Sequence, residues 1–142
     1  MANQHDLAKQ LLQRASDDEA AARAMLSIES VTDMIVGMLA QQGVEKAIKA
    51  VLATRGVDFP FTHDIGGLTR ICKEGKVPLP DDLDGADQLT PYAGALRYDA
   101  EDPKLVDRAT ALRWATAAVS WAQAQVESTA APSAETEHQE GT

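Results

Sequence analysis

The sequence predicts an all-α protein, folded as an antiparallel up-and-down bundle of four long helices plus one shorter helix. Of its 142 residues 44% are apolar but only 4% are aromatic, so the core must consist largely of aliphatic residues and alanine, which favours helices. Apolar residues recur at helical spacing over long segments. The nearest strand candidate, residues 57–61, is short and contains Pro60. The length suits one domain, expected over residues 1–129, before a disordered acidic tail over residues 130–142.

The first two helices are expected over residues 6–25 and from Thr32 to Thr54. The sequence Ser30–Asp33 is typical of a helix N-terminus, and Gly56 stands where a glycine commonly ends a helix. The first half of the second helix is apolar on all sides, which is typical of a helix buried on several sides. Its second half is expected to keep one buried face and to open a polar one.

The third helix is expected to be short. It begins after Thr62 or Asp64, either of which can cap a helix, and it ends near Glu74, before Gly75. Cys72 lies on its apolar face. We therefore expect Cys72 to be a buried small hydrophobic residue, because a reactive thiol needs an exposed and electropositive setting.

A fourth helix is expected over residues 81–98, with Pro91 either kinking it or restarting it. The fifth is expected from residue 103 or 104 to about residue 127, where large aliphatic residues recur every seven positions. Trp114 and Trp121 are also seven residues apart, so they share a face of this helix. A contact in the core or across a dimer interface is expected for them rather than stacking with bases.

Composition excludes several classes of function. The net charge of −9 argues against electrostatic binding of nucleic acid over a broad surface, but it does not exclude a local basic pocket. No apolar run is long enough to span a membrane, and the N-terminus does not resemble a secretory signal. A single cysteine fits a cytoplasmic protein. The three histidines are scattered, so we expect neither a metal site nor a cofactor.

The second helix carries an unusual group of polar residues. Gln41 falls beside the apolar seam, where a buried amide must find partners, and a hydrogen bond to a neighbouring helix is expected. Gln42, Glu45, Lys46 and Lys49 fall on the opposite side. Glu45 and Lys49 form an i, i+4 pair, which by itself indicates a solvated face.

The exact order of residues in this region is more informative than its helical periodicity. The stretch AQQGVEKAIKAVLATRGVDFPFTHDIGGL, residues 40–68, strongly resembles the HEPN family, the higher eukaryote and prokaryote nucleotide-binding domains. A second stretch, LTPYAGALRYD at residues 89–99, is similar to a later landmark of the family. The resemblance extends over about residues 5–128. In the first stretch the matching residues are Gln41, Gln42, Glu45, Lys46, Lys49, Gly56, Pro60, Thr62, His63 and Asp64.

The resemblance is to the small prokaryotic type that is associated with minimal nucleotidyltransferases. It implies a helical bundle that pairs as a homodimer and is encoded beside a separate minimal nucleotidyltransferase, in some cases as a toxin–antitoxin pair. The expected function is therefore a nucleotide- or RNA-associated binding module that works with such a partner. Two alternatives stay open, a metal-free ribonuclease toxin and a purely structural dimerisation subunit.

The ribonuclease signature of the family is not intact. In many members an arginine is followed after four to six residues by a histidine, and two such motifs meet at the dimer interface. Arg97 matches the arginine, but the positions for the histidine hold Asp102, Pro103 and Lys104. An arginine alone cannot shuttle protons near neutral pH. An enzyme of this design is therefore not expected, and His63 is the substitute that the ribonuclease alternative requires.

Two interpretations of His63 stay open. In one, Thr62 or Asp64 caps the third helix and His63 packs against a neighbouring helix. In the other, His63 contacts a ligand in a polar pocket with Lys46, Lys49 and Arg97, beside Tyr98 as a stacking surface. The second requires the edge of the second helix to face a cleft shared with Arg97. The predicted ligand-binding residues are Lys46, Lys49, His63, Arg97 and Tyr98, and the predicted structural polar residues are Gln41, Gln42, Glu45 and Asp64.

Overall fold

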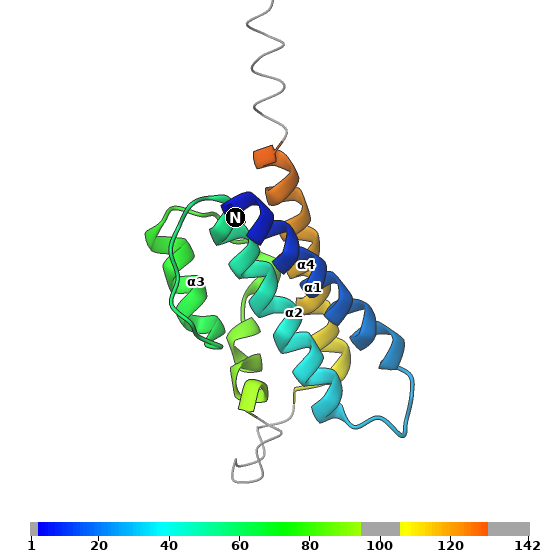
Figure 1. Ribbon diagram of the computed structural model, residues 1–142. Coiled ribbons are helices and arrows are strands. Elements are labelled where there is room, and N and C mark those ends of the chain that lie inside the picture. Colours follow the sequence, from blue (N-terminus) through cyan, green and yellow to red (C-terminus); the bar gives the residue numbers. More distant parts are fainter. Residues whose placement is uncertain (1–2, 95–105, 131–142) are drawn as a thin grey trace, which may run out of the picture.

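Three long helices form the body of the computed structural model, which describes residues 3–94 and 106–130 (Figure 1). They are α1 (Gln4–Met25), α2 (Asp33–Thr54) and α4 (Arg108–Ala130), and each packs against the other two. The shorter α3 (Ile65–Glu74) packs against α2 and against the second of two 3-10 helices, η1 (Asp81–Leu83) and η2 (Ala86–Gly94). These described ranges contain no strand, so the all-α prediction is confirmed.

The direction of the three long helices follows from contacts at their ends. Arg108, at the start of α4, bonds Asp33 at the start of α2, and Arg55 just after α2 bonds Gln125 near the end of α4. Helices α2 and α4 therefore run the same way. Figure 1 shows α1 running in the opposite direction to both, with its N-terminus beside the ends of α2 and α4. The middle helix, α2, thus has neighbours along most of its surface.

The long fourth helix predicted over residues 81–98 is wrong in its described part. The chain there forms the 3-10 helices η1 and η2 in place of one α-helix. Gly85, between them, has a φ of 87°, which an α-helix does not accommodate, and Pro91 inside η2 cannot donate a backbone hydrogen bond. Arg97 and Tyr98 lie outside the described residues, and so does the predicted tail from residue 131 onward.

Helix boundaries elsewhere lie close to the predicted ones because the capping residues act as expected. Thr32 caps α2, and its hydroxyl accepts from the Ile35 amide at 3.4 Å. Gly56 follows the end of α2 with a φ of 69°. The last helix begins later than predicted, at Arg108, because Asp107 accepts from the Thr110 amide at 3.2 Å and so caps it.

The start of α3 is held from outside the helix. Asp64 occupies the cap position, but its side chain makes no capping hydrogen bond. The Ile65 amide instead donates to the hydroxyl of Thr90 on η2 at 3.1 Å. Farther along α3, Cys72 is fully buried, and burial raises the pKa of its thiol to about 11. The prediction that Cys72 is a buried small residue is confirmed.

Tyr92 joins three parts of the fold. Its ring is fully buried and lies against α2 at Gly37, where a side chain on α2 would collide with it. Its hydroxyl accepts a hydrogen bond from the Val106 amide at 2.8 Å, just before α4 begins. One side chain of η2 therefore fixes both the spacing to α2 and the position where the chain enters α4.

Arg108 stabilises the same end of the bundle, where α2 and α4 begin. Its Nε donates to Asp33 Oδ1 at 2.6 Å, and its guanidinium also donates to backbone carbonyls near the end of α1 and in the connection to α2. The carbonyls belong to Met25, Leu26, Ile28 and Val31. Its side chain is largely buried, at 19% exposure. One residue thus ties the starts of α2 and α4 to the end of α1.

Replacing Arg108 with alanine is expected to lower the free energy of unfolding by about 2 kcal/mol, because several carbonyls lose a charged donor. Urea-induced unfolding monitored by circular dichroism measures this difference. Arg14→Ala is the matched control, since Arg14 is exposed on α1 and its loss is expected to leave stability nearly unchanged. Equal effects of the two substitutions would show that Arg108 does not hold the helix ends together.

Candidate functional site

A buried carboxylate in the middle of α2 organises a group of polar side chains. The Glu45 side chain is only 7% exposed. Its Oε2 accepts from Lys49 Nζ at 2.8 Å, and its Oε1 accepts from Gln41 Nε2 at 2.8 Å. The same Oε1 lies 2.9 Å from His63 Nδ1. We call these four residues, Gln41, Glu45, Lys49 and His63, the Glu45 cluster.

Two features of the chain bring the Glu45 cluster together. Gln41, Glu45 and Lys49 are spaced i, i+4 and i+8, so they lie on one face of α2. Residues 55–64 then bring Phe59, Phe61 and His63 back to this face before α3 begins, as their contacts with Lys49 and Glu45 show. Gln41 Nε2 fixes the end of that segment by donating to the backbone carbonyl of His63 at 3.3 Å.

The Glu45 cluster keeps its central carboxylate ionised despite burial. Burial alone would raise the pKa of Glu45. Hydrogen bonds from Lys49, Gln41 and His63, together with the charge of Lys49, outweigh that effect and hold the pKa of Glu45 below its usual range. The pair of Glu45 and Lys49 is therefore a compensated ion pair inside the protein, with His63 attached to it at the surface.

Two phenylalanines complete the surroundings of Lys49. Its Nζ lies 5.9 Å from the ring centroid of Phe59 and 5.8 Å from that of Phe61, both within the range of a cation–π contact. The Phe61 ring also meets the His63 ring edge to face, with centroids 5.6 Å apart. Phe61 is 94% exposed, the most exposed large apolar residue that the structure describes. The surface of the site thus consists of Phe61 and His63, with charge beneath them.

Lys46 lies apart from the Glu45 cluster. Its Nζ donates to Asp18 Oδ2 on α1 at 2.7 Å and also to Gln42 Oε1 at 3.5 Å. Lys46 and Gln42 therefore face α1, whereas Lys49 faces the segment before α3. The structure brings Lys49 together with His63, and it separates both from Lys46.

The expectation that Glu45 and Lys49 form a solvated face is wrong. Their side chains are 7% and 10% exposed, because Phe59, Phe61 and His63 of the following segment lie against this side of α2. The expected bond of Gln41 to a neighbouring helix is also wrong, since Gln41 bonds Glu45 on its own helix and the carbonyl of His63 in the following segment. Asp64 is exposed at the start of α3. The periodicity of α2 alone cannot show that the following segment, residues 55–64, folds back over its polar side.

Phe61 was not among the predicted binding residues. The signal for it is the sequence FPF at residues 59–61, which places two aromatic rings in the segment after α2, and Pro60 favours an extended conformation at Phe59. One of the two rings, Phe59, is half-buried against the core. The other, Phe61, projects into solvent, and no sequence pattern distinguishes which of the two does so.

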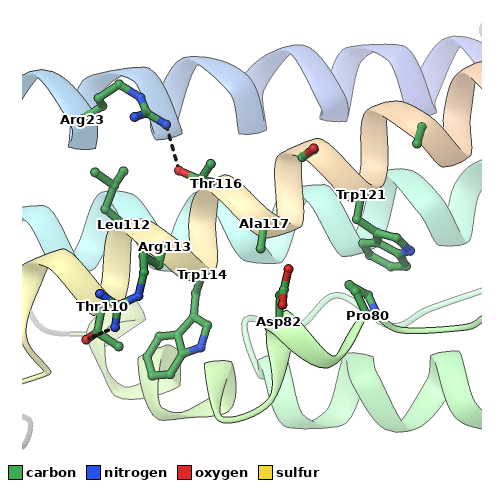
Figure 2. A pocket seen from close by; sticks show the side chains of 12 residues that line it. Arg23, Pro80, Asp82, Thr110, Leu112, Arg113, Trp114, Thr116, Ala117 and Trp121 are labelled. Atoms are coloured by element: carbon green, nitrogen blue, oxygen red, sulfur yellow. Dashed lines mark hydrogen bonds between the residues drawn. The ribbon is translucent and has the colours of Figure 1, made fainter.

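A second feature is a groove of about 920 Å³ along the outer face of α4. Figure 2 shows Trp114 and Trp121 on α4 with Ala117 between them, and Pro80 and Asp82 on the facing side. The indole of Trp114 donates to the backbone carbonyl of Asp84 at 3.2 Å. The two tryptophans therefore share a face, and both are half-buried at the edge of the groove.

Neither feature is arranged as a metal centre. Within residues 3–94 and 106–130, no group of three or more His, Cys, Asp or Glu side chains is placed to hold a metal ion. None of the helices in these ranges is long and apolar enough to cross a membrane. The chemistry that the Glu45 cluster offers is instead hydrogen bonding through an oriented imidazole, next to an exposed aromatic face.

Comparison with known families gives one result. The family model described as HEPN domain matches residues 8–125, from the first turns of α1 to near the end of α4. Neither a curated protein nor a solved structure matches the chain. The match includes every residue of the Glu45 cluster, and it also includes Phe61 and every residue that lines the groove on α4.

Proposed function

This chain belongs to the HEPN domain family, and on that premise we propose that it is a nucleotide- or RNA-associated binding module. Its ligand site is the Glu45 cluster together with Phe61. The observation that carries the proposal is the exposure of Phe61, at 94%, beside an imidazole that a buried carboxylate holds in place. A nucleobase can stack on such a ring, and base–aromatic stacking is a sequence-tolerant source of affinity.

The charge of the protein favours a small or single-stranded ligand. A net charge of −9 repels the dense phosphates of a duplex. Stacking and hydrogen bonding do not depend on that charge. Within the Glu45 cluster the carboxylate of Glu45 is matched by the ammonium of Lys49 at 2.8 Å, so the site itself carries no excess of negative charge. We therefore infer a mononucleotide or a short unpaired stretch of RNA as the ligand class.

Replacing Phe61 with alanine is expected to weaken binding of a mononucleotide or a short single-stranded RNA by about tenfold, because the stacking surface is lost. Isothermal titration calorimetry with the four ribonucleoside monophosphates and a short oligoribonucleotide measures this loss. Since Phe61 is 94% exposed, its removal leaves the core intact. The control is Ile28→Ala, another exposed apolar residue, which lies between α1 and α2. Unchanged affinity in the Phe61 variant would contradict the site assignment.

We also propose that the module works in the cytoplasm with a separate minimal nucleotidyltransferase, in the manner of a toxin–antitoxin-type pair. Membership of the HEPN family and the resemblance to its small prokaryotic type support this proposal. The test is co-expression with a nucleotidyltransferase that is encoded next to this chain. Co-purification of the two chains supports the pairing, and separate elution at micromolar concentration contradicts it.

A homodimer through the outer face of α4 is part of the same proposal. Residues on this face recur at intervals of three and four, as in paired helices. Large and small side chains alternate along it, so that the indole of Trp114 on one copy can pack beside Ala117 and Ser120 of a second copy. Light scattering coupled to size-exclusion chromatography tests this: Ala117→Arg should convert a dimer into a monomer. A dimer that persists in this variant contradicts the assignment of the face.

A second candidate function, metal-free cleavage of RNA, is favoured by one contact. The distance of 2.9 Å between His63 Nδ1 and Glu45 Oε1 is that of a base held by an orienting carboxylate. Binding is the stronger proposal, because the ammonium of Lys49, the other proton donor of the Glu45 cluster with an ionisable side chain, is committed to Glu45. If the protein cleaves a structured RNA and His63→Ala abolishes the cleavage, the ribonuclease function is supported and the binding-module function is contradicted.

A further inference from the structure

The hydrogen bond between His63 and Glu45 determines which imidazole nitrogen carries the proton. Glu45 is held ionised, and a carboxylate can only accept hydrogen bonds. Its Oε1 lies 2.9 Å from His63 Nδ1, so Nδ1 must be the donor. In the neutral imidazole the remaining nitrogen, Nε2, is then an acceptor with a free lone pair. The buried carboxylate thus fixes the tautomer of the neutral ring, with Nδ1 as the donor and Nε2 as the acceptor.

The imidazole that carries this acceptor lies at the surface beside the exposed phenylalanine. The His63 side chain is 55% exposed, although its Nδ1 side is turned toward Glu45. Within residues 3–94 and 106–130 the imidazole makes no other side-chain hydrogen bond. The ring of Phe61 meets it edge to face with centroids 5.6 Å apart. One nucleoside can therefore contact both rings, with its base on Phe61 and its sugar next to His63.

An acceptor at this position selects among the groups of a nucleotide. A phosphate at neutral pH offers acceptor oxygens, which cannot bond a lone pair on Nε2. A sugar hydroxyl offers a proton. The 2′-hydroxyl is the group through which proteins distinguish RNA from DNA. A site whose acceptor forms a hydrogen bond with a ligand hydroxyl also discriminates against an analogue that lacks this hydroxyl, because the acceptor is then left unpaired.

We propose that the Glu45 cluster selects ribonucleotides over deoxyribonucleotides, with His63 Nε2 accepting a hydrogen bond from the 2′-hydroxyl of a nucleotide whose base stacks on Phe61. This inference rests on the proposed binding function and adds the sugar class of the ligand to it. Glu45 acts as a positioning residue, because it contacts the imidazole and leaves the ligand to His63 and Phe61.

The test compares three ligands that differ only at the 2′ position: adenosine monophosphate, its 2′-deoxy form and its 2′-O-methyl form. The 2′-O-methyl form keeps the oxygen but has no hydrogen to donate. The unaltered protein is expected to bind the ribonucleotide about three- to tenfold more tightly than either analogue. His63→Phe keeps a ring in contact with Phe61 and removes the acceptor, so this variant is expected to bind all three ligands with nearly equal affinity.

The outcomes separate this inference from the function on which it rests. If none of the three ligands binds the unaltered protein, the proposed function and the inference both fail. If ribonucleotide and deoxyribonucleotide bind equally well, the inference fails while the binding function stands. A preference for ribose that persists in His63→Phe also overturns the inference. Circular dichroism and urea unfolding establish that the variant is folded, as expected for a substitution at a half-exposed residue.

Discussion

Replacing Glu45 with alanine is expected to lower the free energy of unfolding by about 3 kcal/mol, because it leaves the Lys49 ammonium buried without a counter-charge. The side chain of Lys49 is only 10% exposed, and its Nζ lies 2.8 Å from Glu45 Oε2. The substitution also removes the acceptor for the buried amide of Gln41, which now bonds Oε1 at 2.8 Å. Urea-induced unfolding at neutral pH measures the loss.

A second substitution distinguishes the buried charge from other causes. In Glu45→Gln combined with Lys49→Met both charges are gone, so the desolvation cost of an unpaired ammonium disappears. We expect the double variant to recover about half of the loss seen in Glu45→Ala, or more. If the double variant is as unstable as the single one, the unpaired ammonium is not the source of the effect.

The other lysine of α2 provides a matched comparison. Lys46 Nζ bonds Asp18 Oδ2 at 2.7 Å, but the two side chains are 24% and 18% exposed. Solvent weakens such a pair, so Asp18→Ala is expected to cost less than about 1 kcal/mol. If Asp18→Ala lowered the free energy of unfolding as much as Glu45→Ala, burial would not explain the difference expected between the two ion pairs.

The stability of the protein should depend on the ionisation of Glu45 with a definite sign. Because its pKa is lowered in the folded state, the unfolded chain binds the proton more readily. The contribution is therefore complete above the unfolded pKa, about 4.3, and is lost as the pH falls through the lower folded value. The stability difference between the unaltered protein and Glu45→Gln should shrink on acidification from neutral pH, in urea unfolding at a series of pH values. A difference that grows would contradict this sign.

Replacing Gly37 with alanine is expected to cost about 2–3 kcal/mol, because α2 meets the ring of Tyr92 at this position. A Cβ on Gly37 would lie 2.5 Å from Cδ1 and 2.9 Å from Cζ of Tyr92. The ring is fully buried and its hydroxyl is fixed by the Val106 amide at 2.8 Å, so it cannot move aside without further loss. Thermal and urea unfolding both measure this cost.

Another glycine of the same helix is the control. A Cβ on Gly43 would lie 3.5 Å from the Ala15 carbonyl oxygen and 3.7 Å from Ala115 Cβ, which are ordinary contacts. Alanine also favours a helix over glycine by about 1 kcal/mol. Gly43→Ala should therefore leave the protein as stable or more stable. If Gly37→Ala costs as much in a Tyr92→Ala background as in the unaltered protein, the collision with the ring is not its cause.

Helix boundaries could be predicted wherever local capping chemistry determines them. Thr32 and Gly56 delimit α2 through their own side chain or backbone angle, so the sequence around them suffices. The predicted helix over residues 81–98 failed because Gly85 and Pro91 compete with a favourable apolar spacing. Helix propensity and apolar periodicity do not show whether the helix-breaking residues or the apolar spacing determines the structure. The fully buried ring of Tyr92 adds a tertiary contact that cannot be read from the local sequence.

The candidate site could be predicted in part. Lys46 and Lys49 are three residues apart, so they differ by about 60° around the helix. On a helical wheel both belong to one polar side, yet Lys46 meets Asp18 on α1 and Lys49 meets Glu45 beneath the following segment. The contact of His63 with Glu45 joins residues 18 positions apart, and it depends on how residues 55–64 cross α2. Only the folded chain determines that path.

Phe61 and His63, held by Glu45, form the proposed nucleotide-binding surface. The most direct test is a titration of the isotope-labelled protein with adenosine monophosphate, followed by nuclear magnetic resonance. We expect the largest shifts in the ring signals of Phe61 and His63 and in the amides of residues 61–65. Shifts centred on the indoles of Trp114 and Trp121, or no shifts at millimolar nucleotide, would contradict this proposal.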